Sequence, residues 1–230
     1  MTQTPRYRTL LVSHDVLGAK MAGPGIRYYH LSRILGRYTD LTLAIRPQNE
    51  QALAALQVGL PGVQVIAYTR GDWDSLKAAA EWAEIIILSP YIAPEMPQFA
   101  TLPCALVMDG YDPLLIEWLT TLPNARVEEQ FVQWYGRVMN LFHQYLHSDF
   151  FICATERQRY WWLGQLEVAG RINPYTYHQD PSLRTLVDVV PYGLPDTPAQ
   201  HTRQVIKGVW PGIAPDDVVL LWGGCLLYTS

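Results

Sequence analysis

The sequence contains few cysteines, and this scarcity excludes two kinds of stabilised protein. Only 3 cysteines occur in 230 residues, at Cys104, Cys153 and Cys225. An odd number at wide spacing argues against a disulfide framework, and no His/Cys cluster has the spacing of zinc ligands. Because Cys104 and Cys153 lie within apolar runs, we expect them to be buried thiols in a reducing compartment.

Long apolar segments are also lacking. Residues 1–8 are polar, contain Pro5 and have no apolar core of the ~7–15 residues that a signal peptide needs. The other apolar runs are well below the ~20 residues of a transmembrane helix. We therefore expect a cytoplasmic protein. Peripheral attachment to a membrane stays open, although no strongly basic amphipathic helix favours it.

Excess charge of either sign is absent as well. The chain has 17 Lys and Arg against 21 Asp and Glu, a formal net charge of −4, and no tract of five or more like charges. Nucleic-acid binders need a basic surface for phosphate contacts, so this balance argues against such a partner. The sequence gives no indication of an oligomeric state.

Several catalytic and nucleotide-binding motifs are missing. There is no Gly-x-Gly-x-x-Gly fingerprint of a dinucleotide site and no Gly-Lys-Ser/Thr of a P-loop. There is no Gly-x-Ser-x-Gly elbow for acyl transfer either. We therefore expect no bound metal and no cofactor.

What the sequence does contain is a regular alternation of short apolar runs with helical patterns. We expect strands at residues 9–12, 41–45, 63–68, 84–88, 104–108, 150–154 and 186–190, with helices between them. The clearest amphipathic helix is expected over 126–147. This alternation predicts an α/β fold with a doubly wound parallel sheet, whose strand ends at Ser13, Ser89, Asp109 and Thr155 gather on one edge.

The chain changes character near its C-terminal end. Residues 193–216 are rich in proline, as expected of a linker, and 218–224 read as one more buried strand. We expect an α/β domain over 1–192, a linker over 193–216, and over 217–230 the first strand of a second, missing domain. The last six residues do not continue that pattern and are expected to be an artefact.

The loop after the first strand holds four candidate binding residues. His14 follows that strand directly and can hydrogen-bond a ligand hydroxyl. Gly23 and Gly25 can let backbone N–H groups at a helix start approach a phosphate or a sugar, or they can simply make a turn. Arg27 can bind a phosphate, or it can be a solvated helix residue.

Two later strand ends supply the other candidates. Asp109 and Asp112 flank a turn after the fifth expected strand, and Asp112 can instead cap a helix that begins at Pro113. Glu156 and Arg157 open the helix after the sixth. Glu156 favours a first helical turn whatever its role, so ligand contact and a purely structural role both remain open for this pair.

Four segments, in this order, resemble group 1 (family 4) glycosyltransferases of the GT-B fold. They are residues 22–28 (AGPGIRY), 109–113 (DGYDP), 152–164 (ICATERQRYWWLG) and 189–195 (VVPYGLP). The resemblance implies a Rossmann-like N-terminal domain that holds the acceptor, with the C-terminal domain missing.

The resemblance also implies a function. The full-length enzyme would transfer a sugar from a nucleotide-sugar donor to a glycan, lipid or small-molecule acceptor, with retention and without an essential metal. Asp109 and Asp112 are then the candidate catalytic residues, and the fragment alone is expected to be inactive. Two alternatives remain: a non-catalytic sugar- or nucleotide-binding module, and an NAD-dependent oxidoreductase, which the absent glycine fingerprint disfavours.

Overall fold

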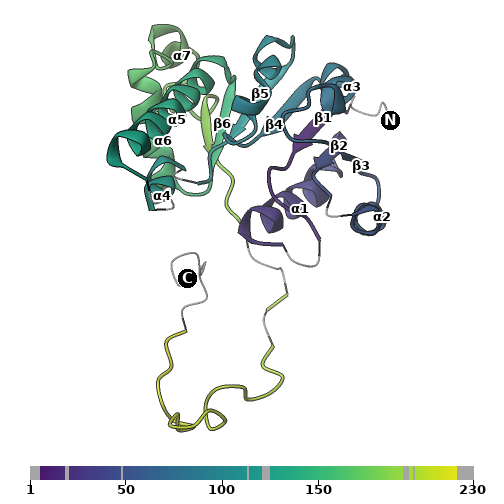
Figure 1. The fold of residues 1–230 in the computed structure, drawn as a ribbon, viewed down its shortest axis with the longest axis vertical. Helices are drawn as coiled ribbons and strands as arrows, with labels where there is room; N and C mark the ends of the chain where they lie inside the picture. Colours follow the sequence, from purple (N-terminus) through teal and green to yellow (C-terminus); the bar gives the residue numbers. More distant parts are fainter. Residues whose placement is uncertain are drawn as a thin grey trace. The chain divides into compact units, whose positions relative to one another are not determined.

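The computed structural model describes residues 6–18, 21–47, 49–112, 114–120, 125–193, 197–198 and 200–221. Within these ranges, seven parallel strands form one sheet in the order β3-β2-β1-β4-β5-β6-β7 (Figure 1). The strands are β1 (Arg8–Val12), β2 (Asp40–Ile45), β3 (Gln64–Ala67), β4 (Ile85–Leu88), β5 (Ala105–Asp109), β6 (Phe150–Cys153) and β7 (Val187–Val189).

Helices connect the strands in the crossover positions that parallel pairing requires. They are α1 (Gly23–Leu35), α2 (Glu50–Gly59), α3 (Asp74–Trp82), α4 (Leu114–Thr120), α5 (Val127–His147), α6 (Glu156–Val168) and α7 (Pro174–Gln179), with short 3-10 turns η1 (Ala93–Glu95) and η2 (Pro97–Thr101). The predicted fold class, a doubly wound parallel α/β sheet, is confirmed.

The strand order places a switch point between β1 and β4. From β1 the chain moves outward to β2 and β3, and it then returns to the other side of β1 with β4. Because all pairs are parallel, the strands end at one common edge, as the sequence predicted. Doubly wound sheets bind their ligands at this edge, in the crevice at the switch point.

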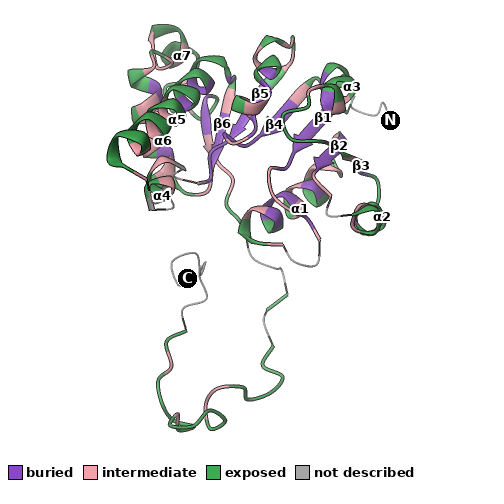
Figure 2. Cartoon of the chain, viewed as in Figure 1, coloured by how far each residue is buried: buried purple, intermediate pink, exposed green. Residues whose placement is uncertain are grey.

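Successive residues of β1 face opposite layers of the core. Leu11 packs with Tyr28 of α1 and Leu56 of α2. Leu10 packs on the other face with Leu76 of α3 and Phe99 of η2. This alternation explains the continuous apolar runs, since a strand covered on both faces needs apolar side chains at every position. Figure 2 shows the buried strands between exposed outer helix surfaces.

Helix α1 buries a different face from the one that its apolar residues suggest. Ile26 and Ile34, two of its apolar residues, are 42% and 52% exposed. The buried positions include Arg27, Tyr28 and Ser32. The apolar spacing identified the helix but not its inward face, because Arg27 is buried through an ion pair that hydrophobicity alone does not reveal.

The chain divides into two compact units, Met1–Tyr192 and Gly193–Ser230. The strand predicted over 218–224 is wrong for its described part, since residues 218–221 have no strand geometry and Leu220 is 94% exposed. A strand needs a neighbour for its backbone groups, and none pairs with these residues in the described part of the chain. The rest of that strand and the supposed artefact lie outside the described residues.

Both cysteines that the structure describes are free thiols, with Cys153 buried and Cys104 partly buried. No described helix is long and apolar enough to cross a membrane.

Candidate functional site

A cavity of about 510 Å³ opens at the carboxyl edge of the sheet, beside the switch point. Its lining includes the side chains His14, Arg46, Arg70, Tyr91, Glu95 and Arg137, together with the polar residues Gln133, Asn140 and Gln144 of α5. Its volume lies within the usual range of small-molecule sites, roughly 300–1,000 Å³. The fold thus forms a cavity of ligand size at the edge where doubly wound sheets bind their ligands.

Part of this lining comes from residues that follow the inner strands. His14 lies just beyond β1, Arg46 immediately follows β2, and Tyr91 lies in the loop after β4. Parallel strands end at the same edge, so these side chains converge although they are distant in sequence. The opposite wall belongs to α5, where Gln144 donates from Nε2 to the carbonyl of Pro90 at 3.0 Å. This bond fixes α5 against the β4 loop.

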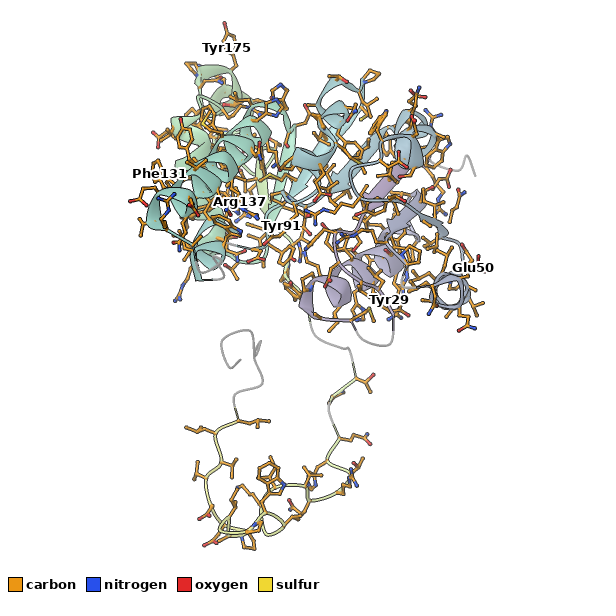
Figure 3. The ribbon with its side chains drawn as sticks, in the orientation of Figure 1. Tyr29, Glu50, Tyr91, Phe131, Arg137 and Tyr175 are labelled. Carbon is orange, nitrogen blue, oxygen red and sulfur yellow. The ribbon has the colours of Figure 1, made fainter. Side chains whose placement is uncertain are left out.

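Three arginines give the cavity a positive character. Arg70 is ion-paired with Glu95, the one carboxylate that lines the cavity in the part of the chain that the structure describes. The Arg137 guanidinium carbon lies 4.1 Å from the centre of the Trp118 ring. Burial lowers the pKa of Arg137, and the positive charge of Arg70 lowers it further, although Tyr91 opposes this. The two cations therefore share one space, which an anion between them would stabilise. Figure 3 shows Arg137 and Tyr91 toward the middle of the domain.

His14 is neutral at physiological pH. Burial lowers its pKa to about 4, Asp15 opposes the shift, and Arg46 adds to it. The Arg46 guanidinium donates a hydrogen bond to the main-chain carbonyl of His14, and the imidazole lies 4.9 Å from the Tyr91 ring. Within the described chain, His14 Nδ1 and Gln144 Oε1 are buried without hydrogen-bond partners. Such atoms in a cavity wall are positions for a ligand or water.

Arg27 and Asp109 are bound to each other and lie outside this cavity. Arg27 Nε and Nη2 each donate to one Asp109 carboxylate oxygen at 2.8 Å, and Nη1 donates to the carbonyl of Val190. The rings of Tyr111 and Tyr192 lie 5.1 and 5.3 Å from the guanidinium carbon. Burial alone would lower the pKa of Arg27, but the paired Asp109 carboxylate raises it. Arg27 is therefore not a solvated helix residue.

Gly23 and Gly25 occupy the first turn of α1 and do not line the cavity. Neither has a positive φ, so left-handed backbone geometry is not the reason for glycine here. A Cβ added at Gly25 would lie 2.3 Å from the Val16 carbonyl oxygen. Gly25 is needed because the loop after β1 packs directly on the helix start. A Cβ added at Gly23 would meet only the Tyr192 hydroxyl, at an ordinary contact distance of 3.9 Å.

The remaining predicted residues lie elsewhere on the same edge. Asp112 and Arg157 line a smaller cavity of about 200 Å³ next to Trp161 and Trp162. Glu156 is half exposed and forms an ion pair with Arg184 at 2.6 Å. Of the residues predicted from the sequence, only His14 lies in the larger cavity, and ligand binding or catalysis by the others stays a prediction.

The sequence interpretation missed the arginines of this cavity. Arg46 and Arg70 follow β2 and β3, and Arg137 lies in the middle of α5. The sequence did contain a signal for Arg46 and Arg70. Each comes just after a predicted strand and therefore lies at the edge of the sheet where ligands bind. Arg137 had no such signal, since its position depends on how α5 packs against the sheet.

No protein-family model and no curated protein matches the chain. Among solved structures, it is similar to a short-chain dehydrogenase/reductase from Veillonella parvula at 17% identity, over 65% of this chain and 69% of that chain, with a TM-score of 0.39. A second such structure from the same organism, described as in complex with NADP, is 17% identical over 65% and 70% of the two chains, with a TM-score of 0.37. At this identity the likeness concerns the fold.

These comparisons correct the resemblance to glycosyltransferases. The two solved structures described above are dehydrogenases/reductases, and they give no support to a glycosyltransferase, a nucleotide-sugar donor or a sugar acceptor. The sequence segments that carried the resemblance begin at or near strand ends and helix starts, for example at Gly23, Asp109 and Glu156. Doubly wound sheets need glycine, proline and capping residues at such places, so the segments reflected the fold and not the chemistry.

The described residues contain no group of three or more His, Cys, Asp or Glu side chains that could hold a metal ion.

Proposed function

We propose that this domain binds a small, phosphate-bearing molecule in the cavity between the strand ends and α5. The observation that carries the proposal is the clustering of Arg46, Arg70 and Arg137 around one cavity where, among the described lining residues, Glu95 is the one carboxylate. Arginine presents its donors in a planar fork that matches phosphate oxygens, so three of them favour a ligand with more than one negative charge.

The cavity also has a surface suited to a ring. Tyr91 and Trp118 line it, and His14 lies against Tyr91 as a neutral imidazole. Neutral His14 adds no repulsion toward a cationic or uncharged ring, and its unpartnered Nδ1 can accept or donate a hydrogen bond. A phosphate group at the arginines and a planar or sugar ring near Tyr91 together describe a nucleotide-like ligand.

A specific observation favours phosphorylated dinucleotides as a second candidate. Arg46 follows β2 about 20 residues after Gly23 and Gly25, which lie in the first turn of α1. In dinucleotide-binding sheets this region meets the adenosine ribose, and an arginine there accommodates the 2′-phosphate of NADP. If this second candidate is right, the protein is an NADP-dependent oxidoreductase. The missing glycine fingerprint and the closeness of Val16 to Gly25 leave less room for a pyrophosphate at α1 than such sites usually have.

One titration panel tests both candidates. Calorimetry with pyrophosphate, ADP, NAD⁺ and NADP⁺, against adenosine and ribose as uncharged controls, should show binding of the phosphate-bearing compounds only. NADP⁺ binding at least tenfold tighter than NAD⁺, about 1.4 kcal/mol, would support the dinucleotide candidate. Equal affinity for ADP and NADP⁺ would argue against it. Binding of adenosine as tightly as ADP would contradict an arginine-based site.

A further inference from the structure

Buried polar atoms without hydrogen-bond partners gather at the end of β4. In the described part of the chain six buried side-chain nitrogen or oxygen atoms have no partner, and four of them belong to His14, Tyr28, Ser89 and Gln144. Gln144 bonds the Pro90 carbonyl, next to Ser89. The His14 ring lies 4.9 Å from the Tyr91 ring and 5.8 Å from the Tyr28 ring. Because buried polar atoms are almost always paired, such a group beside a cavity indicates a place where a ligand binds.

The amide of Gln144 has one favourable orientation. Gln144 is 4% exposed and lines the large cavity. Its Nε2 donates to the carbonyl of Pro90 at 3.0 Å and to the carbonyl of Asn140 at 3.3 Å. These two bonds use both amide hydrogens, and a flipped amide would turn its own oxygen toward two other oxygens. Oε1 of Gln144 is therefore fixed as a hydrogen-bond acceptor that has no donor within the described chain.

His14 supplies the second atom. It lines the same cavity from the end of β1, and its Nδ1 has no partner in the described chain. Gln144 is bonded to Pro90 and His14 lies against Tyr91, the next residue, so both atoms belong to the same end of the cavity. Tyr28 and Ser89 are 0% exposed and do not line the cavity. Of the four residues, a ligand in the cavity therefore meets His14 and Gln144.

These two atoms restrict the chemical group that binds between them. Gln144 Oε1 only accepts, so the ligand must donate to it, which excludes a carboxylate, a fully ionised phosphate and a carbonyl. An ammonium group donates, but Arg46 and Arg137 line the same cavity and repel it. An uncharged N–H group satisfies His14 in one tautomer only, whereas a hydroxyl donates and accepts and so satisfies both. Two neighbouring hydroxyls serve both residues at once.

We propose that Gln144 and His14 bind neighbouring hydroxyl groups of the ligand, which makes the substrate class a phosphate ester that carries a vicinal diol, as ribonucleotides do. The inference rests on the proposed function, because the arginines hold the phosphate that brings the hydroxyls to this end of the cavity. Gln144 and His14 then determine specificity, since a phosphate ester without the diol leaves both buried atoms unpaired.

Calorimetric titration of the full chain with pyrophosphate, ADP and 2′,3′-dideoxy-ADP tests this inference. The two nucleotides have the same base and phosphates and differ only in two hydroxyls. We expect ADP to bind about tenfold more tightly than dideoxy-ADP. Equal affinity of the two nucleotides, with pyrophosphate still bound, would overturn the inference and leave the proposed function standing. No binding of any of the three would overturn the proposed function and the inference with it.

Two variants identify the residues responsible for the preference. Gln144→Met and His14→Phe each keep a side chain of similar size and remove the polar atom, so the two nucleotides should bind with nearly equal affinity. Gln98→Met is the matched control, since Gln98 is exposed on η2 and does not line the cavity, and it should keep the preference.

Circular dichroism shows whether each variant folds. Gln144→Met also loses the bond that holds α5 to Pro90, whereas His14→Phe leaves that bond intact. His14→Phe therefore decides the question if Gln144→Met does not fold. A full preference for ADP over dideoxy-ADP in every folded cavity variant would contradict the assignment to Gln144 and His14.

Discussion

Arg27 and Asp109, 82 residues apart in the chain, form a buried two-bond ion pair that joins α1 to the end of β5. The side chains are 1% and 0% exposed. The third donor of Arg27 reaches Val190, just beyond β7, so one guanidinium connects three parts of the domain. Its orientation toward Asp109 explains why neither residue lines the large cavity.

Loss of one partner of this pair should destabilise the domain strongly. Asp109→Asn keeps the shape but leaves Arg27 without its counter-charge, and the free energy of unfolding should fall by about 3 kcal/mol or more. Urea titration followed by circular dichroism measures the change. Glu129→Gln removes half of the exposed pair Arg126–Glu129 and should cost less than about 1 kcal/mol. Equal small losses in both variants would contradict a structural role for the buried pair.

Two glycines in one helical turn provide a matched comparison. Gly25→Ala places a methyl group 2.3 Å from the Val16 carbonyl, so the loop must move and stability should fall by about 1–3 kcal/mol. Gly23→Ala meets only the Tyr192 hydroxyl, at an ordinary contact distance of 3.9 Å, and should leave stability unchanged or slightly raised, because alanine favours helix more than glycine does. Thermal unfolding of the two variants gives the comparison. An equal effect at both positions would show that packing at Gly25 is not the cause.

His14 should make the stability of the domain depend on pH. Its pKa is about 4 in the folded chain against an ordinary value of 6.5. Between about pH 4 and pH 6.5 the unfolded chain binds a proton at His14 that the folded chain does not. The contribution of His14 to the free energy of unfolding is therefore lost as the pH falls from about 6.5 to about 4.

The variant His14→Phe isolates the effect, because it keeps a ring but has no titrating nitrogen. The free energy of unfolding should decrease between pH 7 and pH 4.5 in both proteins. The decrease should be about 2 kcal/mol larger in the wild type than in the variant. Identical pH profiles for the two proteins would mean that His14 is accessible to protons in the folded state.

The fold could be predicted from the sequence because its strands are buried on both faces. Runs such as Ile85–Leu88 are apolar at every position, and helical segments alternate with them, which leaves few topologies. The inward face of α1 could not be predicted in the same way. Arg27 is buried there through its bond to Asp109, and a contact across 82 residues has no local signal.

The candidate site was only partly predictable. His14 was found because it directly follows the first strand. Arg46 and Arg70 follow strands as well, but their importance depends on Arg137, which the packing of α5 brings to the same cavity. The family resemblance failed for a related reason: turn and capping residues at strand ends are shared by proteins of unrelated chemistry.

The central claim is that arginines from two strand ends and from α5 bind one phosphate-bearing ligand. The most direct measurement is calorimetric titration of ADP into the wild type, Arg46→Gln and Arg137→Gln, with Arg33→Gln, an exposed arginine of α1, as the control. We predict that each cavity variant weakens binding by about tenfold or more, equivalent to about 1.4 kcal/mol, and that the control matches the wild type. Unchanged affinity in both cavity variants, or no binding of ADP and pyrophosphate by the folded wild type, would contradict the claim.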